Sequence, residues 1–407
     1  MRLCLVTTFY PPYNFGGDGI HVQRLAEALA RRGHEVTVVH SRGAYRALRG
    51  DADAGAMESE PVAGVRVFSQ AGIAGRLEPF LVHQSGVPVL SRGYLARTLA
   101  GPDGSGFDVI HYHNVSLVGG VGVFALGGGV KLFTAHEYWL GCPTHLLFRY
   151  NREVCTRRTC VRCTLRARRP PQWWRYTGLA RRHLSQLDVM IFPSALTESV
   201  YRELGIDRPG IVLPHFLPDR YLRDAAGRGE RDAGAPDYCL YVGRLDAVKG
   251  LQYVLPSFAG GDAQMPLWIA GAGPQGDELR RRYGDSPNVR FLGHLGGERL
   301  GALYRDAAAV ILPSAGLETF GQVILEAFAH GTPAITSGTG GGRELGEASG
   351  AGFTYDSTPA LLLALEQVVD PAVRDRLGGR AKDYIGRAHA ESAYLDRYES
   401  LIEEQRR

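Results

Sequence analysis

The sequence has 407 residues, of which 44% are apolar and 22% are charged, close to the averages for folded soluble proteins. At roughly 150 residues per domain this length predicts two domains, so a small single-module binding protein and a disordered chain are both excluded. The net charge of +4 is too small for this length to favour nucleic acid as a partner. Glycine, with 53 residues, is about twice as frequent as usual. The basic residues include only three lysines, Lys131, Lys249 and Lys382.

The lengths of two apolar runs indicate where in the cell the protein is located. The N-terminal run reaches Pro11 before a secretion signal of sufficient length develops, so we expect a cytoplasmic protein. The longest weakly polar run, residues 115–130, is shorter than the roughly 20 residues of a membrane span. We expect a buried loop and helix there.

The first forty residues predict one strand–helix–strand unit. An apolar strand at residues 3–6 leads into a glycine loop at residues 16–19. Apolar residues then recur at helical spacing from Val22 to Leu29, and Gly33 stops this helix before a second apolar run at residues 36–39.

The rest of the chain repeats this alternation. We expect further strands at residues 65–68, 109–111, 132–134, 189–192 and 211–213. Residues 218–236 shift to Arg, Asp, Gly and Ala, which predicts a linker, and a second series of strands follows at residues 238–242, 267–270, 289–292, 309–312 and 334–336. The fold class is therefore α/β, with two tandem doubly wound, Rossmann-like domains facing a central cleft. We place the domains at residues 1–215 and 216–385, with an insertion at about 142–182 and a C-terminal helix, 386–407, that crosses back to the first domain.

The strongest chemical motif spans residues 313–333. A buried strand ends at residue 312, a helix is predicted to start near residues 319–321, and Gly331 and Pro333 stop it. A helix start offers unpaired amides and a positive dipole end, which suit a phosphate. Glu318 precedes this helix, and Glu326 lies about 80° further round it. The two carboxylates are thus predicted to bind two parts of one elongated molecule.

A second motif follows the first strand of the second series. Gly243 and Arg244 lead to Lys249 and Gly250. Arginine binds a diphosphate through paired hydrogen bonds, and lysine adds a point charge. Because lysine is so rare in this chain, Lys249 favours a specific role over solvation of the surface.

These motifs together resemble the retaining glycosyltransferases of family 4, of the bacterial biosynthetic type, which have the two-domain GT-B fold. The resemblance covers nearly the whole chain, through Gly16, Gly17 and His21, residues 107–113, residues 243–250, residues 291–293, and the pair Glu318 and Glu326, which matches the family's E-x7-E motif.

The resemblance implies a role for each matching residue. Arg244 and Lys249, after Gly243, would neutralise the donor diphosphate, and Glu318 would bind donor-sugar hydroxyls near the amides of Thr319, Phe320 and Gly321. Glu326 would bind the ribose, the base would lie near Leu292, Gly293 and His294, and Gly16 and Gly17 would close on the donor and acceptor. His136 matches the active-site histidine. We assign to the acceptor side a set of four residues: His21, His113, Tyr138 and Trp139.

The implied reaction moves a sugar from a nucleotide-diphosphate donor to an acceptor that is a small molecule, a saccharide or a lipid-linked compound. Preorganised positive charge at the diphosphate would make a catalytic metal unnecessary. One Asp-x-Asp pair, Asp51 and Asp53, could bind Mg²⁺, but no strand precedes it and we expect no catalytic role. The resemblance implies retention of the anomeric configuration. Substitution on the donor's front face, assisted by the leaving phosphate, is the working hypothesis.

A competing motif follows the strand at residues 267–270. Residues 271–276 contain G-x-G-x-x-G through Gly271, Gly273 and Gly276, which alone would indicate an NAD(P)-dependent oxidoreductase. The match is weak because the next strand, residues 289–292, does not end in an acidic residue. A non-catalytic nucleotide-sugar-binding protein is a further alternative.

Four of the six cysteines cluster in the predicted insertion, at Cys142, Cys155, Cys160 and Cys163. Their spacing is typical of a structural zinc site, while disulfides and free thiols remain alternatives.

The same region carries eleven arginines between residues 149 and 182, with Glu153 as its one acidic residue. Three interpretations remain: an anionic acceptor, docking on anionic lipid at the inner face of the membrane, or an arginine-rich surface without a specific ligand.

Overall fold

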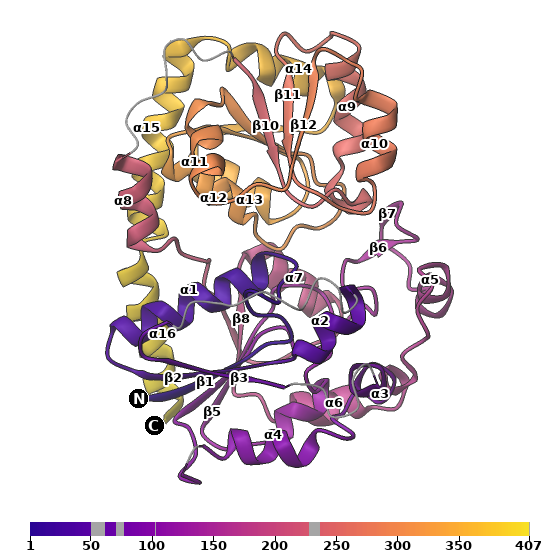
Figure 1. Cartoon of the computed structure of the whole chain (residues 1–407), viewed down its shortest axis with the longest axis vertical. Helices are drawn as coiled ribbons and strands as arrows, with labels where there is room; N and C mark the ends of the chain where they lie inside the picture. Colours follow the sequence, from indigo (N-terminus) through magenta and orange to yellow (C-terminus); the bar gives the residue numbers. More distant parts are fainter. Residues whose placement is uncertain (50–61, 71–76, 102, 228–236, 407) are drawn as a thin grey trace. The chain divides into compact units, whose positions relative to one another are not determined.

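The computed structural model describes residues 1–49, 62–70, 77–101, 103–227 and 237–406. The chain forms two compact units (Figure 1). The N-terminal unit comprises Met1–His145, Thr159–Leu213 and Tyr394–Arg407, and the C-terminal unit comprises Leu146–Arg158 and Pro214–Ala393. Asp51 and Asp53 lie outside the described residues.

The N-terminal unit is built on a parallel sheet of seven strands in the order β3-β2-β1-β4-β5-β8-β9. The strands are β1 (Arg2–Val6), β2 (Glu35–His40), β3 (Val65–Ser69), β4 (Val109–Tyr112), β5 (Val130–Thr134), β8 (Val189–Phe192) and β9 (Gly210–Val212). In the register, Leu3 of β1 lies between Val36 of β2 and Val109 of β4. The central strands β4, β5 and β8 are buried along their whole length, as expected for apolar runs covered on both faces.

The helices of this unit are α1 (Gly17–Arg31), α2 (Arg42–Arg49), α3 (Leu77–Ser85), α4 (Arg92–Leu99), α5 (Cys160–Arg166), α6 (Leu179–Leu184) and α7 (Ala195–Glu203), with the short 3-10 helices η2 (Val121–Ala125) and η3 (Trp173–Tyr176). The last helix, α16 (Glu391–Arg406), belongs to this unit from Tyr394 onward. Arg32 pairs with Asp396 at 2.7 Å and with Glu399 at 2.9 Å, which anchors α16 beside the end of α1.

The C-terminal unit has a second parallel sheet, of six strands in the order β12-β11-β10-β13-β14-β15. Its strands are β10 (Cys239–Val242), β11 (Leu267–Ala270), β12 (Val289–Gly293), β13 (Ala309–Leu312), β14 (Ala334–Ser337) and β15 (Gly352–Tyr355). An antiparallel hairpin from the insertion, β6 (Phe148–Arg149) and β7 (Glu153–Val154), also belongs to this unit.

The helices of the C-terminal unit are α8 (Asp219–Gly227), α9 (Leu251–Ala259), α10 (Gly276–Tyr283), α11 (Gly297–Asp306), α12 (Gln322–Ala329), α13 (Gly341–Ser349), α14 (Thr358–Gln367) and α15 (Pro371–Ala388), with the 3-10 turn η4 (Ala247–Lys249). Alternate residues of β10 enter separate apolar clusters, Cys239 and Tyr241 on one side and Leu240 and Val242 on the other. Helices therefore cover both faces of this sheet, as its parallel strands require.

The α/β fold class, with two doubly wound parallel sheets in tandem, is confirmed, and every strand predicted from an apolar run is present. Three differences concern regions outside those runs. The segment predicted as a linker contains α8 over residues 219–227. The C-terminal helix predicted over residues 386–407 is instead divided between the end of α15 and α16, with His389 as the cap at the end of α15. Strand β15 and the β6–β7 hairpin were not predicted. Within the described residues, no helix is both long and apolar enough to cross a membrane.

Candidate active site

In the second sheet the order in which successive strands are added reverses between β10 and β13. Strands β11 and β12 lie on one side of β10, and β14 and β15 lie on the far side of β13. In open parallel sheets, ligands bind beyond the carboxyl ends of the strands at such a switch point. The loops that follow β10 and β13 are the two that carry Lys249 and Glu318.

Lys249 and Glu318 form an ion pair at this point. The Lys249 Nζ atom donates to both carboxylate oxygens of Glu318, at 2.9 and 2.7 Å. Ser314, in the same loop as Glu318, donates a hydrogen bond of 2.9 Å to Oε2. Burial raises the pKa of the Glu318 carboxyl, but the Lys249 charge and these hydrogen bonds outweigh burial, so that the pKa is lowered from its usual 4.5. Both side chains stay partly open, with 29% of Lys249 and 18% of Glu318 exposed.

Gly250 explains how the lysine loop fits against the glutamate loop. Its φ is +72°, and a Cβ atom there would lie 1.9 Å from the Pro313 carbonyl oxygen. Only glycine allows this approach. Backbone amides of Ala315 and Gly316 donate to the Val248 carbonyl, at 2.9 and 3.1 Å, and fix the two loops together.

Two helices begin close to Glu318. Helix α12 starts at Gln322, one residue later than the predicted range, after Gly321 with a φ of +106°. The Gly341 amide, at the start of α13, donates to the Glu318 carbonyl, and a Cβ on Gly340 would lie 2.6 Å from the Glu318 nitrogen. The starts of two helices, each the positive end of a helix dipole, therefore lie beside the loop that carries Glu318, an arrangement suited to phosphate.

Glu326 occupies a separate position one helical turn into α12. Its Oε2 accepts a hydrogen bond of 3.1 Å from the hydroxyl of Tyr304, a fully buried residue of α11. The side chain is half-buried. Glu318 therefore lies in the loop before α12 and Glu326 on the helix itself, and the two carboxylates have different partners.

Arg244 is open to solvent, with 54% of its side chain exposed. Its Nε atom lies 3.7 Å from an Asp246 carboxylate oxygen, and its carbonyl accepts from the Tyr241 hydroxyl at 2.8 Å. The backbone of the arginine is held while its guanidinium faces solvent.

The glycines of residues 271–276 pack against this same turn. A Cβ on Gly271 would lie 1.8 Å from the Gly243 carbonyl oxygen, and one on Gly273 would lie 2.4 Å from that of Leu245. The Gly271 amide donates to the Gly293 carbonyl at 2.7 Å. Close packing between loops therefore accounts for the G-x-G spacing without a dinucleotide. Leu292 and Gly293 end β12 next to this turn, and His294 is exposed just beyond them.

In the N-terminal unit the predicted active-site histidine is part of a group of four histidines. His136 follows β5, and its Nε2 lies 2.9 Å from Nδ1 of His113, which follows β4. The His21 ring lies 5.2 Å from the His136 ring. His111 stacks within 4.0 Å of His113 and is held through both nitrogens, by the Tyr398 hydroxyl at 2.9 Å and the Thr134 hydroxyl at 2.8 Å.

Burial keeps the rings of His136 and His111 neutral. It lowers the pKa of His136 to about 3 and that of His111 well below its usual value, with His136 opposing protonation of His111 further. In the 2.9 Å contact between His113 and His136, one ring nitrogen must donate and the other accept. The contact therefore fixes the tautomer of His136 together with its orientation.

Three polar residues of this unit were not predicted. Asn114 donates 3.1 Å to a carboxylate oxygen of Asp18, in the first turn of α1. Burial raises the pKa of Asp18, and the nearby Glu137 carboxylate raises it further. Glu137 in turn pairs with His145 at 2.7 Å. A sequence signal existed for each, because Asp18 lies in the glycine loop and Asn114 and Glu137 directly follow predicted site histidines.

The other predicted residues of this unit differ in exposure. Gly16 and Gly17 are exposed at the start of α1, where Asn14 exchanges two hydrogen bonds with Gly16. In contrast, His21, His113, Tyr138 and Trp139 are all buried. These four rings therefore present little surface to an acceptor.

Models of two known families match the chain. The model described as "Glycosyltransferase Family 4" matches residues 15–218, and the one described as "Glycosyl transferases group 1" matches residues 236–370. The chain is also 30% identical to glycogen synthase of Mycobacterium tuberculosis over 94% of this chain and 89% of that protein. The chain belongs to glycosyltransferase family 4. It is therefore an enzyme of the glycosyltransferase class, and the oxidoreductase and non-catalytic alternatives are set aside.

Solved structures support the same fold for this glycosyltransferase. Sucrose-phosphate synthase from Thermosynechococcus elongatus is similar with a TM-score of 0.69 at 23% identity, covering 99% of this chain and 98% of that one. The Anabaena protein HepE, solved in complex with UDP and glucose, is similar with a TM-score of 0.65 at 17% identity, covering 99% and 100%. These likenesses establish the GT-B fold.

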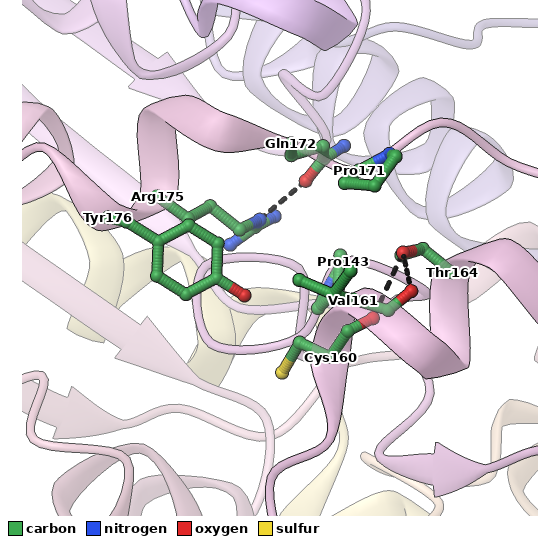
Figure 2. Close-up of a pocket in the computed structure, with 8 residues that line it drawn as sticks. All are labelled: Pro143, Cys160, Val161, Thr164, Pro171, Gln172, Arg175 and Tyr176. Carbon is green, nitrogen blue, oxygen red and sulfur yellow. Dashed lines mark hydrogen bonds between the residues drawn. The ribbon is translucent and has the colours of Figure 1, made fainter.

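The insertion of this glycosyltransferase contains a shallow pocket in the N-terminal unit (Figure 2). Its lining residues are Pro143, Cys160, Val161, Thr164, Pro171, Gln172, Arg175 and Tyr176. Its empty space is about 160 Å³, below the roughly 300–1,000 Å³ of small-molecule sites. The Arg175 guanidinium, which lines it, donates to the carbonyls of Trp139 and Leu140 at 2.6 and 2.9 Å. The pocket is thus a small gap in the packing, and the hydrogen bonds of Arg175 beside it connect the insertion to the loop after β5.

The predicted zinc site is not confirmed. All four clustered cysteines lie in the described residues, yet no three His, Cys, Asp or Glu residues there are placed to hold a metal ion. Cys142, Cys160 and Cys163 belong to the N-terminal unit and Cys155 to the C-terminal unit. The Cys142 thiol instead contacts the Thr144 hydroxyl at 3.3 Å, and the Cys155 thiol donates to the Arg157 carbonyl at 3.6 Å. None of the six cysteines, all of them described, forms a disulfide.

Proposed function

We propose that this glycosyltransferase moves a sugar from a nucleoside-diphosphate donor to an acceptor hydroxyl, with retention of configuration and without a catalytic metal. The observation that carries the proposal is the Lys249–Glu318 pair at the switch point of the second sheet. A lysine held by a carboxylate, beside two helix starts and an open arginine, forms a site with both an anion-binding and a hydroxyl-binding side.

We assign the diphosphate to Lys249, Arg244 and the amides of Phe320 and Gly321. Negative charge grows on the leaving diphosphate as the glycosidic bond breaks, and preorganised positive charge stabilises it there. Glu318 keeps carboxylate lone pairs for the sugar hydroxyls, and Glu326 accepts from the ribose. The base lies against residues 292–294, at the end of the edge strand β12.

On the N-terminal unit we assign to His136 a hydrogen bond with the transferred sugar. The ring acts as a neutral donor or acceptor, since burial lowers its pKa to about 3. Because His21, His113, Tyr138 and Trp139 are buried, we move acceptor recognition to the more open polar groups of the same loops, Asp18 and Glu137. In the proposed reaction the acceptor attacks the face from which the diphosphate leaves, and the departing phosphate takes the hydroxyl proton.

Donor binding tests this proposal without knowledge of the acceptor. UDP-glucose, ADP-glucose and GDP-mannose are titrated calorimetrically into the wild-type enzyme and into Lys249→Met. We expect one donor to bind the wild type and its affinity to fall by roughly tenfold to a hundredfold in the variant, because a charge-assisted contact is lost.

Lys382→Met is the matched control, since Lys382 is an exposed lysine of α15 in the same unit. Unchanged donor affinity in Lys249→Met, or an equal loss in Lys382→Met, contradicts the assignment. Metal independence is tested on the same donor: exhaustive chelation is expected to leave turnover intact, and loss of turnover that Mg²⁺ restores refutes that part of the proposal.

A further inference from the structure

Residues 77–101 and 159–187 of the N-terminal unit contribute a surface whose single acidic residue is Glu78. Glu78 is buried, and its carboxylate accepts hydrogen bonds from the amides of Leu90 and Ser91 and from the Ser91 hydroxyl. The eight exposed arginines of these two segments are Arg92, Arg97, Arg162, Arg166, Arg168, Arg169, Arg181 and Arg182. We call this surface the basic face.

The two segments form one continuous surface. The Trp174 indole donates to the His83 carbonyl at 3.1 Å, and a Cβ on Gly86 would lie 2.6 Å from the Trp174 ring. Helix α3 and helix α6 both pack against η3. The electrostatics agree: burial lowers the pKa of His83 to about 4, and the charges of His145, Arg169 and Arg175 lower it further.

Large apolar side chains are exposed on the same surface. Of the twelve such side chains among the described residues, seven belong to these two segments: Leu77, Phe80, Val89, Leu90, Leu165, Trp173 and Tyr176. Each is between 41% and 61% exposed. Clustered apolar groups on a monomer surface mark an interaction site, and here they are interspersed with arginines.

We propose that the basic face binds the surface of an anionic phospholipid bilayer. The arginines match the negative headgroups, while Trp173 and Tyr176 have the amphipathic rings that favour the headgroup level. Leu77, Phe80 and Leu165 add apolar area that enters the boundary of the acyl chains. Nucleic acid would also attract the arginines, but exposed leucine and valine gain nothing from a phosphate backbone.

The consequence is a glycosyltransferase that works at a membrane surface, where an acceptor carried by a lipid is concentrated. This goes beyond the proposed transfer reaction and does not rest on it, because vesicle binding needs neither donor nor turnover. A failure of donor binding and a failure of membrane binding are therefore separate results.

The test is co-sedimentation of the full chain with vesicles of phosphatidylcholine alone and of phosphatidylcholine with phosphatidylglycerol. We expect binding only to the anionic vesicles, with a steep loss between low and high salt. Arg181→Gln/Arg182→Gln, on α6, is expected to lower the partition coefficient about thirtyfold. Tyr176→Ala is expected to weaken binding further through loss of interfacial contact.

Two controls match these variants in the other unit. Arg281→Gln/Arg282→Gln removes an adjacent exposed pair from α10, and Tyr253→Ala removes a ring that is 58% exposed, against 61% for Tyr176. Both controls are expected to bind vesicles like the wild type, and all variants are checked for an unchanged melting temperature. The proposal is overturned if the wild type does not bind anionic vesicles, or if the controls lose as much binding as the variants of the basic face. It is also overturned if single-stranded polynucleotide competes fully with the vesicles.

Discussion

The histidines behind the ends of β4 and β5 show how one residue's chemistry is set by its neighbours. His136 contacts His113 at 2.9 Å, and His113 rests on His111, whose two nitrogens are both held by hydroxyls. The hydrogen bonds from Tyr398 and Thr134 thus fix the orientation of His111, and through His113 that of the proposed sugar-binding ring of His136. His113, predicted to face the acceptor, has a supporting position instead.

Because His136 is neutral in the folded protein, we expect the free energy of unfolding to depend on pH. Its pKa in the folded protein is about 3, below the usual 6.5, so the unfolded chain binds a proton between these values that the folded protein does not. Stability must therefore fall as pH drops below 6.5, by up to about 1.4 kcal/mol per pH unit for one such histidine. We expect His136→Gln to show a shallower loss of unfolding free energy between pH 6.5 and 4.5 than the wild type.

Urea denaturation across this pH range measures the effect. Above pH 7 the protonation contribution vanishes, and the difference between the two proteins there reports only lost packing and hydrogen bonding. Parallel pH profiles of wild type and His136→Gln would show that the ring is protonated in the folded enzyme, against this account.

At the scale of elements, the turn from β10 into α9 decides where Lys249 lies. Gly250 has a φ of +72° and no room for a side chain against Pro313, whereas Gly261, just after α9, has a φ of +88° and open space around its Cα. Both positions require a left-handed backbone, but only at Gly250 would a side chain also clash with a neighbouring loop.

These two glycines give a matched pair of variants. Gly261→Ala is expected to cost about 1 kcal/mol of unfolding free energy, for the left-handed backbone alone. Gly250→Ala is expected to cost roughly 1–3 kcal/mol more, because the Cβ must push the β10 and β13 loops apart, and to weaken donor binding as Lys249 moves away from Glu318. Chemical denaturation and donor titration measure both. Equal costs at the two positions would show that the loop contact is dispensable.

The elements also mark how far a sequence predicts this structure. Apolar runs such as β8 and β13 are predictable because both faces of a parallel strand are buried. Strand β15 was not predicted because it is only half-buried at the sheet edge. The two-residue strands of the hairpin are too short to show an alternation of apolar and polar residues. Glycine and proline positions predicted a helix start near residues 319–321, one residue before the observed start at Gln322.

Contacts between distant residues were harder to predict. Lys249 and Glu318 were assigned separate roles, and their direct pairing across 69 residues depends on the approach of Gly250 to Pro313. Tyr138 and Trp139 follow a site strand, which predicts exposure to ligand. However, Arg175 and Trp174 of the insertion cover Trp139, and the Tyr138 ring lies beside Tyr201 of α7. The four cysteines have the spacing of a zinc site, yet spacing alone does not bring their thiols to a common centre.

On the scale of the whole molecule, each unit has its own sheet and its own share of the proposed chemistry. The residues assigned to the nucleotide all belong to the C-terminal unit: they follow β10, β12 and β13. A nucleotide that binds only the folded C-terminal unit must stabilise that unit first, by about 2.7 kcal/mol at a concentration 100 times its dissociation constant.

Hydrogen exchange followed by mass spectrometry can resolve this asymmetry. With saturating nucleoside diphosphate, and no sugar or acceptor, we expect slower exchange in residues 243–250, 292–294 and 314–326, and unchanged exchange in β1, β2 and β3 of the N-terminal unit. At the same nucleotide concentration, Lys249→Met is expected to reduce the protection and Lys382→Met to preserve it. Protection that appears first in the N-terminal unit would move the nucleotide site away from the β10–β13 switch point, because the amides nearest a bound diphosphate are the ones that it orders most directly.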